Sequence, residues 1–501
     1  MQRLLLPSLL LLFLTACQPD DLAPLLPVDE GTTPLSRTEL NTLVATHLQT
    51  TDRVFDWNKA DTRTVWSALA LSDHQAVLGY QPAGFAGIDQ RIHQIDVTAG
   101  EWLRTRNELV SDLLAATARH TGQAVTENEL FVAPEDGVLP ILEVRILHPA
   151  VLAEFRQRAE VRYLEPSNYT AAEIELRSGS GCGEAAASAV ASADFTSRNG
   201  GKVPWNYAYA NIEQAWSRSQ GEDIGICIID SGTYPEQDAL NGGFGRGRSL
   251  SRLGVYQPSW WSSRTDGPDD QCGHGTQMAG IAAAPQTSTG RSIGVAYRSD
   301  LVTIRATSDV IINGSNEKRG VKDALVIAGN DAGTQIVSMS IGDVFSSGTV
   351  EDGIRYAHNR GKLLLAAAGT SLSWTSWYGV IFPASMAETV AVTGIRTGTP
   401  FQRCDNCHDG SLVDFVAVMQ RREATDRTTL TLARSGATPG YVGGSSAATA
   451  TTAGIAALVW ATDPTQSREQ VLDRMKRAAS SYPARDSEFG WGIIDADAAT
   501  R

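Results

Sequence analysis

The chain has 501 residues, of which 42% are hydrophobic, and a formal net charge of -14. This length predicts two or three domains, and the hydrophobic share is normal for a globular protein with a large core. Because binding to nucleic acid is dominated by basic contacts to phosphate, the acidic balance argues against a nucleic-acid partner. We interpret the acidity as a soluble, self-repelling surface.

The amino terminus has the pattern of a secretion signal. Gln2 and Arg3 precede an apolar stretch over residues 4–14 that is too short to cross a bilayer as a helix. The tetrad LTAC that ends at Cys17 is similar to a bacterial lipobox, in which the signal, here residues 1–16, is cut off and the cysteine is lipidated. A glutamine follows the cysteine, which is typical of outer-membrane sorting, and several acyl chains would make the anchor stable. A plain signal with an incidental cysteine is the alternative.

Three segments precede the main body of the chain. Residues 17–50 contain four prolines with little periodicity, which predicts a flexible tether. Residues 51–167 predict a small α+β domain, with a helical face within 101–120 and strand-like alternation at 142–146. Residues 168–202 are rich in Ser, Ala and Gly, which predicts an exposed linker where proteolysis would concentrate.

Residues 203–501 alternate apolar runs such as ICIID, IVSMSIG and LLLAAAG with helical stretches. This alternation predicts an α/β fold with a doubly wound, mainly parallel sheet covered on both faces. Functional sites in such sheets form at the carboxyl ends of the strands, where Asp230 follows the run ICII.

Five cysteines remain beyond Cys17, so at least one is unpaired in an oxidising compartment. Cys227 lies in an apolar run and is interpreted as a buried filler. The segment Cys404 to His408 matches the CxxCH haem-attachment pattern and would also suit zinc. A short loop, either closed by a disulfide or solvated, is the simpler interpretation of this segment.

Three short segments carry the groups that nucleophilic acyl transfer needs. They are ICIIDSG with Asp230, CGHGTQMAG with His274 and GGSSAATATTAG with Ser446. A serine hydroxyl becomes a good nucleophile when a histidine takes its proton and a carboxylate holds that histidine. The order Asp, His, Ser along the chain is the subtilisin order.

These blocks resemble the subtilisin-like serine proteases over residues 203–501. The resemblance implies a serine endopeptidase in which Asp230 orients His274, His274 is the general base, and Ser446 attacks the peptide. The backbone NH of Ser446, at the start of a helix, would be one oxyanion donor. Residues 51–167 resemble, more weakly, the propeptide of that family, which inhibits the enzyme until it is cut away. A separate binding module is the alternative for this unit.

The resemblance also assigns the substrate cleft. Ser340, Ile341 and Gly342, in the run SMSIG, would offer main-chain hydrogen bonds to an extended polypeptide. The run LLLAAAG would form a wall of the pocket for the residue before the cut bond. Trp374 and Trp377 follow it and would either narrow that pocket or serve packing.

Calcium often accompanies this family, and no ligand-rich loop matches its usual sites. The stretch APQTSTGRSIG after the histidine helix contains no carboxylate. Asp269 and Asp270 would be able to bind an ion, although adjacent exposed acids usually do not. We therefore expect no metal site.

Several positions depart from the family pattern, among them Ala450, which stands in place of the usual proline and is a good helix former. Thr370 stands where an asparagine amide would donate to the oxyanion, and losing such a donor costs about 10²- to 10³-fold in turnover. Gln277 replaces a histidine often found after GHGT. Because of Thr370, we keep a weakly active or inactive surface-binding homologue as an alternative function. A transpeptidase or cyclase using the same triad is a further one.

Overall fold

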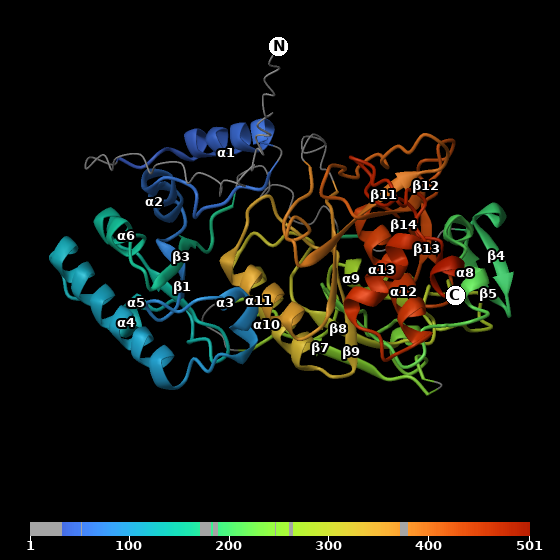
Figure 1. Cartoon of the computed structure of the whole chain (residues 1–501), viewed down its shortest axis with the longest axis horizontal. Helices are drawn as coiled ribbons and strands as arrows, with labels where there is room; N and C mark the ends of the chain where they lie inside the picture. Colours follow the sequence, from blue (N-terminus) through green and yellow to red (C-terminus); the bar gives the residue numbers. More distant parts are fainter. Residues whose placement is uncertain are drawn as a thin grey trace, which may run out of the picture.

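The computed structural model describes residues 33–51, 53–170, 182–183, 189–245, 247–259, 264–370 and 379–501. These residues form two bodies that lie side by side, one from residues 33–170 and one from residues 189–501 (Figure 1). The expected signal, Cys17, Trp374 and Trp377 fall outside the described residues. No helix within the described ranges is long and apolar enough to span a membrane.

The N-terminal body is a small α+β unit, as the sequence predicts. Its antiparallel sheet has the order β2-β1-β3. The strands are β1 (Gln75–Tyr80), β2 (Ile141–Arg145) and β3 (Val161–Pro166). The helices are α1 (Arg37–Thr51), α2 (Thr62–Ala70), α3 (Ile88–Arg91), α4 (Gly100–Thr121), α5 (Glu127–Leu130) and α6 (Pro149–Phe155), with a 3-10 turn η1 (Ile92–Gln94).

Part of the predicted tether is helical. Helix α1 covers the whole stretch from residue 37 to residue 50, and it buries Leu40, Val44 and Leu48, which lie on one helical face at a spacing of four. The expectation of a flexible segment is therefore wrong for these residues, because the four prolines all lie before the helix begins.

The second body contains a parallel sheet of seven strands in the order β12-β11-β10-β9-β6-β8-β7. This confirms the predicted doubly wound α/β class. The strands are β6 (Gly225–Asp230), β7 (Leu250–Gly254), β8 (Asp300–Arg305), β9 (Thr334–Met339), β10 (Leu363–Ala367), β11 (Thr389–Arg396) and β12 (Phe415–Gln420).

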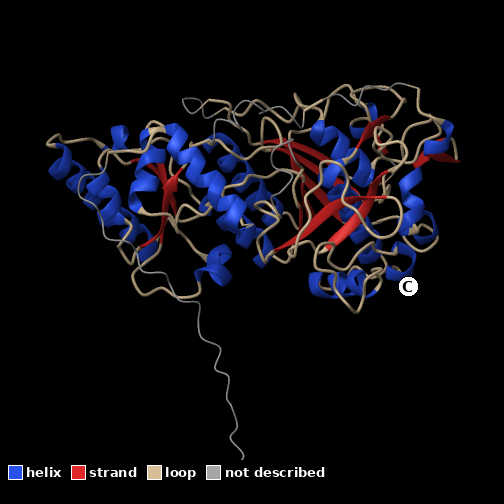
Figure 2. Cartoon of the chain, turned by 90° about the horizontal axis from the view of Figure 1, so that it is seen from above, coloured by secondary structure: helices blue, strands red, loops and turns tan. Residues whose placement is uncertain are grey.

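Helices cover both faces of this sheet (Figure 2). One face packs against α9 (His274–Ala283), α12 (Gly444–Ala461) and α13 (Arg468–Arg477). The other packs against α10 (Ser315–Asn330) and α11 (Gly348–Asn359). Strand side chains alternate between faces, so Ile226 and Ile228 enter the first core and Cys227 and Ile229 the second. A strand buried on both sides must be apolar throughout, which explains the run ICII.

Smaller elements complete the body. They are β4 (Phe195–Arg198), β5 (Gly201–Pro204), β13 (Thr429–Thr431), β14 (Gly440–Val442), α8 (Ile212–Ala215), α14 (Ala496–Ala499) and the 3-10 turns η2 (Ser192–Asp194), η3 (Trp205–Ala210) and η4 (Asp238–Leu240). The elements η2, β4 and β5 lie at least partly within residues 189–202, which the sequence predicts to be part of an exposed linker. Asp194 is fully buried and pairs with Arg427 and Tyr441, so the second body includes residues 189–202.

The two bodies meet where β1, α3 and η1 of the N-terminal body pack against α11, with α10 beside it (Figure 1). Arg162 of β3 donates two hydrogen bonds, of 2.8 and 2.6 Å, to the carboxylate of Asp352 on α11. The neighbouring Tyr163 hydroxyl donates to the same carboxylate at 2.9 Å. Arg319 on α10 likewise makes a two-pronged pair with Glu143 of β2.

We predict that Arg162→Ala lowers the free energy of unfolding of the full chain by up to about 3–5 kcal/mol, because it leaves the buried Asp352 with Arg355, 3.9 Å away, as its remaining cation. Urea denaturation measures this cost. The control Arg119→Ala removes an exposed pair with Glu154 and should cost less than about 1 kcal/mol. Equal costs for both variants would contradict the importance of the buried pair.

Candidate active site

Asp230 is the last residue of β6, at the carboxyl end of the sheet, and only 1% of its surface is exposed. A buried carboxylate needs donors. One oxygen accepts from the backbone NH of Ser231 at 2.7 Å, and both oxygens lie 2.9 Å from Nδ1 of His274. Because a carboxylate only accepts, Nδ1 carries the proton, and Nε2 of the neutral ring keeps its lone pair.

His274 begins helix α9, and the two glycines beside it are needed for its position. Gly273 adopts a left-handed φ of 96°, which a side chain would disfavour. A Cβ on Gly275 would lie 2.2 Å from the backbone oxygen of Gly232, so only glycine lets α9 approach the loop after β6. The motif GHG therefore reflects backbone geometry around the histidine.

Asp270 holds the first turn of α9 in place. Its carboxylate accepts hydrogen bonds from the backbone NH groups of Cys272, Gly273 and Thr276 and from the hydroxyls of Ser231 and Thr276. A carboxylate near a helix start also interacts favourably with the helix dipole. The sequence suggested this acid only as a cation ligand, and its oxygens are instead occupied by the protein.

The neighbouring Asp269 pairs with Arg252. Within the described ranges, no group of three or more His, Cys, Asp or Glu side chains is arranged to hold a metal ion.

The electrostatic surroundings favour the charged form of His274. Burial works against the imidazolium, but the charge and hydrogen bond of Asp230, with smaller contributions from Asp270 and Asp309, outweigh it. The pKa of His274 is consequently raised above its ordinary value. The ring is thus suited to receive a proton.

Ser446 lies in the first turn of α12, which packs beside α9. Its hydroxyl donates to the backbone oxygen of Ser340 at 3.5 Å, and the Ser340 hydroxyl donates to the backbone oxygen of Ser446 at 3.1 Å. Among the hydrogen bonds of the described residues, none joins Ser446 to His274. The structure therefore brings Asp230 and His274 into contact and ties Ser446 to the end of β9.

Thr370 follows β10 and reaches the start of α12. Its Oγ1 lies 2.9 Å from the hydroxyl of Ser445 and accepts from the Ser445 NH at 3.3 Å. The backbone of Thr370 also pairs with that of Cys407, which is joined to Cys404 by a disulfide. The CxxCH segment is thus a disulfide-closed loop that lies directly beside the loop carrying Thr370.

The predicted peptide-binding residues lie at the carboxyl end of β9. Ser340 and Ile341 are nearly fully buried. The NH of Gly342 donates to the backbone oxygen of Val310 at 3.0 Å, and its oxygen accepts from the NH of Ile312 at 3.1 Å. In this structure the main-chain groups of Gly342 already have partners within the protein.

A second disulfide lies next to the site and was not anticipated. Cys182, in the predicted linker, is bonded to Cys272, two residues before His274. Gly183 donates its NH to Cys272 and accepts from the side chain of Gln277 at 2.6 Å. The unusual Gln277 is the sequence signal for this contact, since its amide holds the linker backbone against α9. Cys227, by contrast, is buried and unpaired, as predicted.

Comparisons with known proteins bear on this arrangement. The chain is 29% identical over 302 residues to subtilisin Savinase of Lederbergia lenta, covering 60% of this chain and 99% of that protein. It is 29% identical over 295 residues to the minor extracellular protease Epr of Bacillus subtilis strain 168, covering 58% of this chain and 40% of that protein.

Among solved structures, the fold is similar to MycP1 from the ESX-1 type VII secretion system, with a TM-score of 0.49 and 20% identity, covering 64% of this chain and 90% of that one. A family model described as the subtilase family matches residues 221–492, more than half of the chain. The protein therefore belongs to the subtilase family and is a subtilisin-like serine endopeptidase that acts on polypeptides.

Proposed function

We propose that the chain hydrolyses peptide bonds through an acyl-enzyme on Ser446, with His274 as general base and Asp230 as the group that orients it. The contact between the buried Asp230 carboxylate and Nδ1 of His274 carries this proposal. It leaves Nε2 as the free base at the rim of the sheet where α12 presents Ser446.

In the first half-reaction, His274 Nε2 takes the hydroxyl proton while Oγ of Ser446 forms a bond to the peptide carbonyl carbon. The tetrahedral intermediate collapses when His274 returns that proton to the leaving amine. Water then repeats the sequence and frees the acid. Ser446 must first leave its bond to Ser340, which at 3.5 Å is too long to hold it firmly.

The developing oxyanion would be stabilised at the start of α12. The first NH groups of a helix have no partner within the helix, and the helix dipole favours negative charge there. The NH of Ser446 is the donor that we propose. We propose Thr370 as a second and weaker donor, because its Oγ1 already contacts Ser445.

We predict that Ser446→Ala abolishes covalent labelling by a small alkyl fluorophosphonate and hydrolysis of a peptide substrate, because no other group supplies the nucleophile. If the chain processes itself, this variant also stays full length. Mass spectrometry of the labelled protein and amino-terminal sequencing measure both outcomes. Labelling that persists in Ser446→Ala would refute the assignment.

The Asp230→Asn variant should shift the pH dependence of hydrolysis. The free base of His274 is active, so the wild-type rate rises as pH passes through its raised pKa. Without the Asp230 charge, the pKa of His274 falls and the rise moves to lower pH, while the plateau falls by about 10⁴-fold. The control Asp269→Asn changes an acid that pairs with Arg252. An unmoved limb in Asp230→Asn would contradict the proposed pair.

Replacing Thr370 by asparagine should raise turnover on a peptide substrate, by as much as about 10²-fold, because the longer amide reaches the oxyanion. The control Thr370→Val removes the hydroxyl at similar volume. A rate that falls in Thr370→Asn and in Thr370→Val alike would show that the threonine hydroxyl already serves as the donor.

We also propose that residues 51–167 serve as a propeptide, that Cys17 carries a lipid, and that the precursor resides in the bacterial cell envelope as an outer-membrane lipoprotein. The extracellular relative supports secretion. The Cys182–Cys272 disulfide determines whether processing releases the second body from the N-terminal body. A cut before Cys182 would end the covalent link between the two bodies, whereas a cut after it would leave them joined through the disulfide to Cys272. Reducing and non-reducing gels of the processed protein distinguish these cases.

A further inference from the structure

The segment from Ser340 to Ser346, which follows β9, already has main-chain partners along its length. Gly342 pairs with Val310 and Ile312, as described above. Further along, the oxygen of Val344 accepts from the NH of Phe55 at 2.8 Å, and the NH of Ser346 donates to the oxygen of Phe55 at 3.0 Å.

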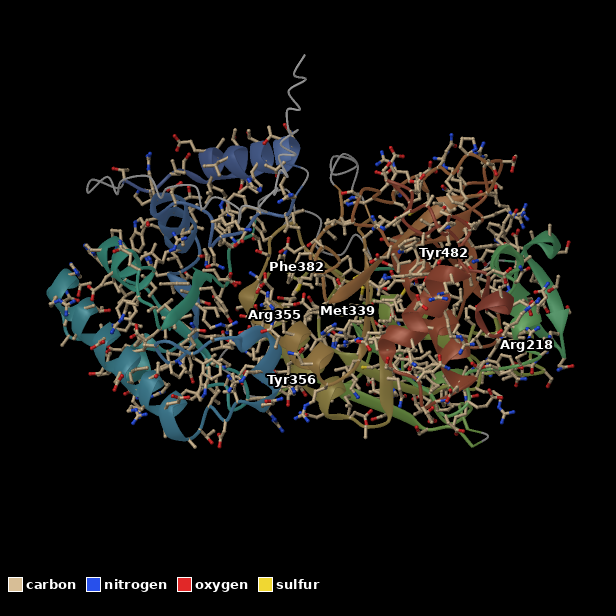
Figure 3. The ribbon with its side chains drawn as sticks, viewed as in Figure 1. Arg218, Met339, Arg355, Tyr356, Phe382 and Tyr482 are labelled. Carbon is tan, nitrogen blue, oxygen red and sulfur yellow. A yellow bond between two sulfur atoms is a disulfide. The ribbon has the colours of Figure 1, made fainter. Side chains whose placement is uncertain are left out.

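The main-chain partners of this segment lie on its two opposite sides. Alternate residues of an extended chain direct their main-chain groups to opposite sides. Gly342, Val344 and Ser346 belong to one alternate series, and Asp343 belongs to the other. Asp343 exchanges two hydrogen bonds with Phe382, which is labelled near the centre of Figure 3. Phe55 therefore binds the segment on the same side as the main-chain groups of Gly342 that would bind a peptide.

Phe55 belongs to the N-terminal body, and its pairing with Phe345 is parallel. Three aromatic rings reinforce the contact. Trp57 stacks on Phe345 at 5.2 Å with an angle of 14° between the planes, and Phe55 meets Phe345 edge-on at 5.9 Å. All three side chains are at least 96% buried. Such aromatic pairs stabilise the contact beyond the area that they bury.

The segment that carries these rings is firmly held within its own body. The Arg156 guanidinium donates to the backbone oxygens of Trp57, Asn58 and Ala60, at 3.2, 3.0 and 2.9 Å. On the other side, His47 of α1 packs edge-on against Phe55 at 5.2 Å. The pairing with Val344 and Ser346 is thus made by a structured element.

The end of the N-terminal body takes a different path. Ser167 accepts from Lys318 of α10, and Asn168 accepts from the NH of Ser315 at the start of α10. The Thr170 oxygen accepts from Arg37 of α1. Within the described ranges, residues 167–170 make no hydrogen bond to Gly342. The N-terminal body therefore pairs with the segment after β9 through Phe55, near its beginning. Residues 167–170 contact α10 and α1 instead.

We infer that residues 53–57 act as an internal lock on the peptide-binding edge. An extended substrate needs the main-chain groups of Gly342, so the segment must separate from Val310 and Ile312. Phe55 and Trp57 hold its far end at Val344 and Phe345, and they oppose this separation. The lock excludes peptides that extend several residues before the cut bond, and it leaves Ser446 open to small acylating reagents. This inference rests on the proposed function of Ser446 as the nucleophile.

The test compares two reagents on the full-length chain, a small alkyl fluorophosphonate and a tetrapeptidyl one that occupies the cleft before the cut bond. The variants Phe55→Ala and Trp57→Ala should raise the labelling rate by the tetrapeptidyl reagent by about 10-fold or more, because the competent state becomes more populated. The small reagent should label all forms equally. The control Leu103→Ala alters an exposed side chain of α4 and should change neither rate.

Two additional measurements guard against misfolding of the variants. Hydrogen exchange at Gly342 should accelerate in Trp57→Ala while exchange along β10 is unchanged. A synthetic peptide of residues 51–60 added to Trp57→Ala should slow tetrapeptidyl labelling again, and the same peptide with Phe55→Ala should not.

Equal tetrapeptidyl labelling of wild type and both variants would overturn the lock and leave the nucleophile assignment intact. Failure of the small reagent to label any form would instead count against Ser446.

Discussion

The burial of one charged carboxylate sets the geometry of the active-site region. Asp230 ends a strand that is covered on both faces, so its charge has lost water and requires partners from the protein. The Ser231 NH and the His274 ring supply them. The ring reaches Asp230 because glycines let α9 approach and because Asp270 accepts the donors of the first helical turn. The charge and hydrogen bond of Asp230 also raise the pKa of His274, so the contact that the buried carboxylate needs also makes the ring more basic.

The N-terminal body restrains the second body at several independent places. The charged pairs of Arg162 and Arg319 hold it against α10 and α11. The aromatic contact at Phe345 holds it beside the segment after β9, which we propose binds the peptide. The Cys182–Cys272 disulfide fixes the connection between the bodies next to His274. In the lock that we propose, separation of the bodies and access to the site are therefore linked, because the same contacts serve both.

Local patterns were reliable wherever the chemistry is local. Apolar runs buried on two faces identified the strands, and small residues with a serine identified the start of α12. The tether at residues 37–50 and the linker at 189–202 were misjudged for the opposite reason. Helix α1 is stabilised by burying Leu40, Val44 and Leu48 against distant residues, and Asp194 is held by Arg427 from far along the chain. Composition alone does not report such partners.

By itself, the sequence determined the α/β class, the order of Asp230, His274 and Ser446, and the family, because each depends on residue types within short segments. The tertiary structure decided the pairing of Cys182 with Cys272, the capping role of Asp270 and the contact of Phe55 with the segment after β9. These features join residues that are remote in the chain. Only the packing of the folded bodies, which depends on shape and burial, brings such residues together.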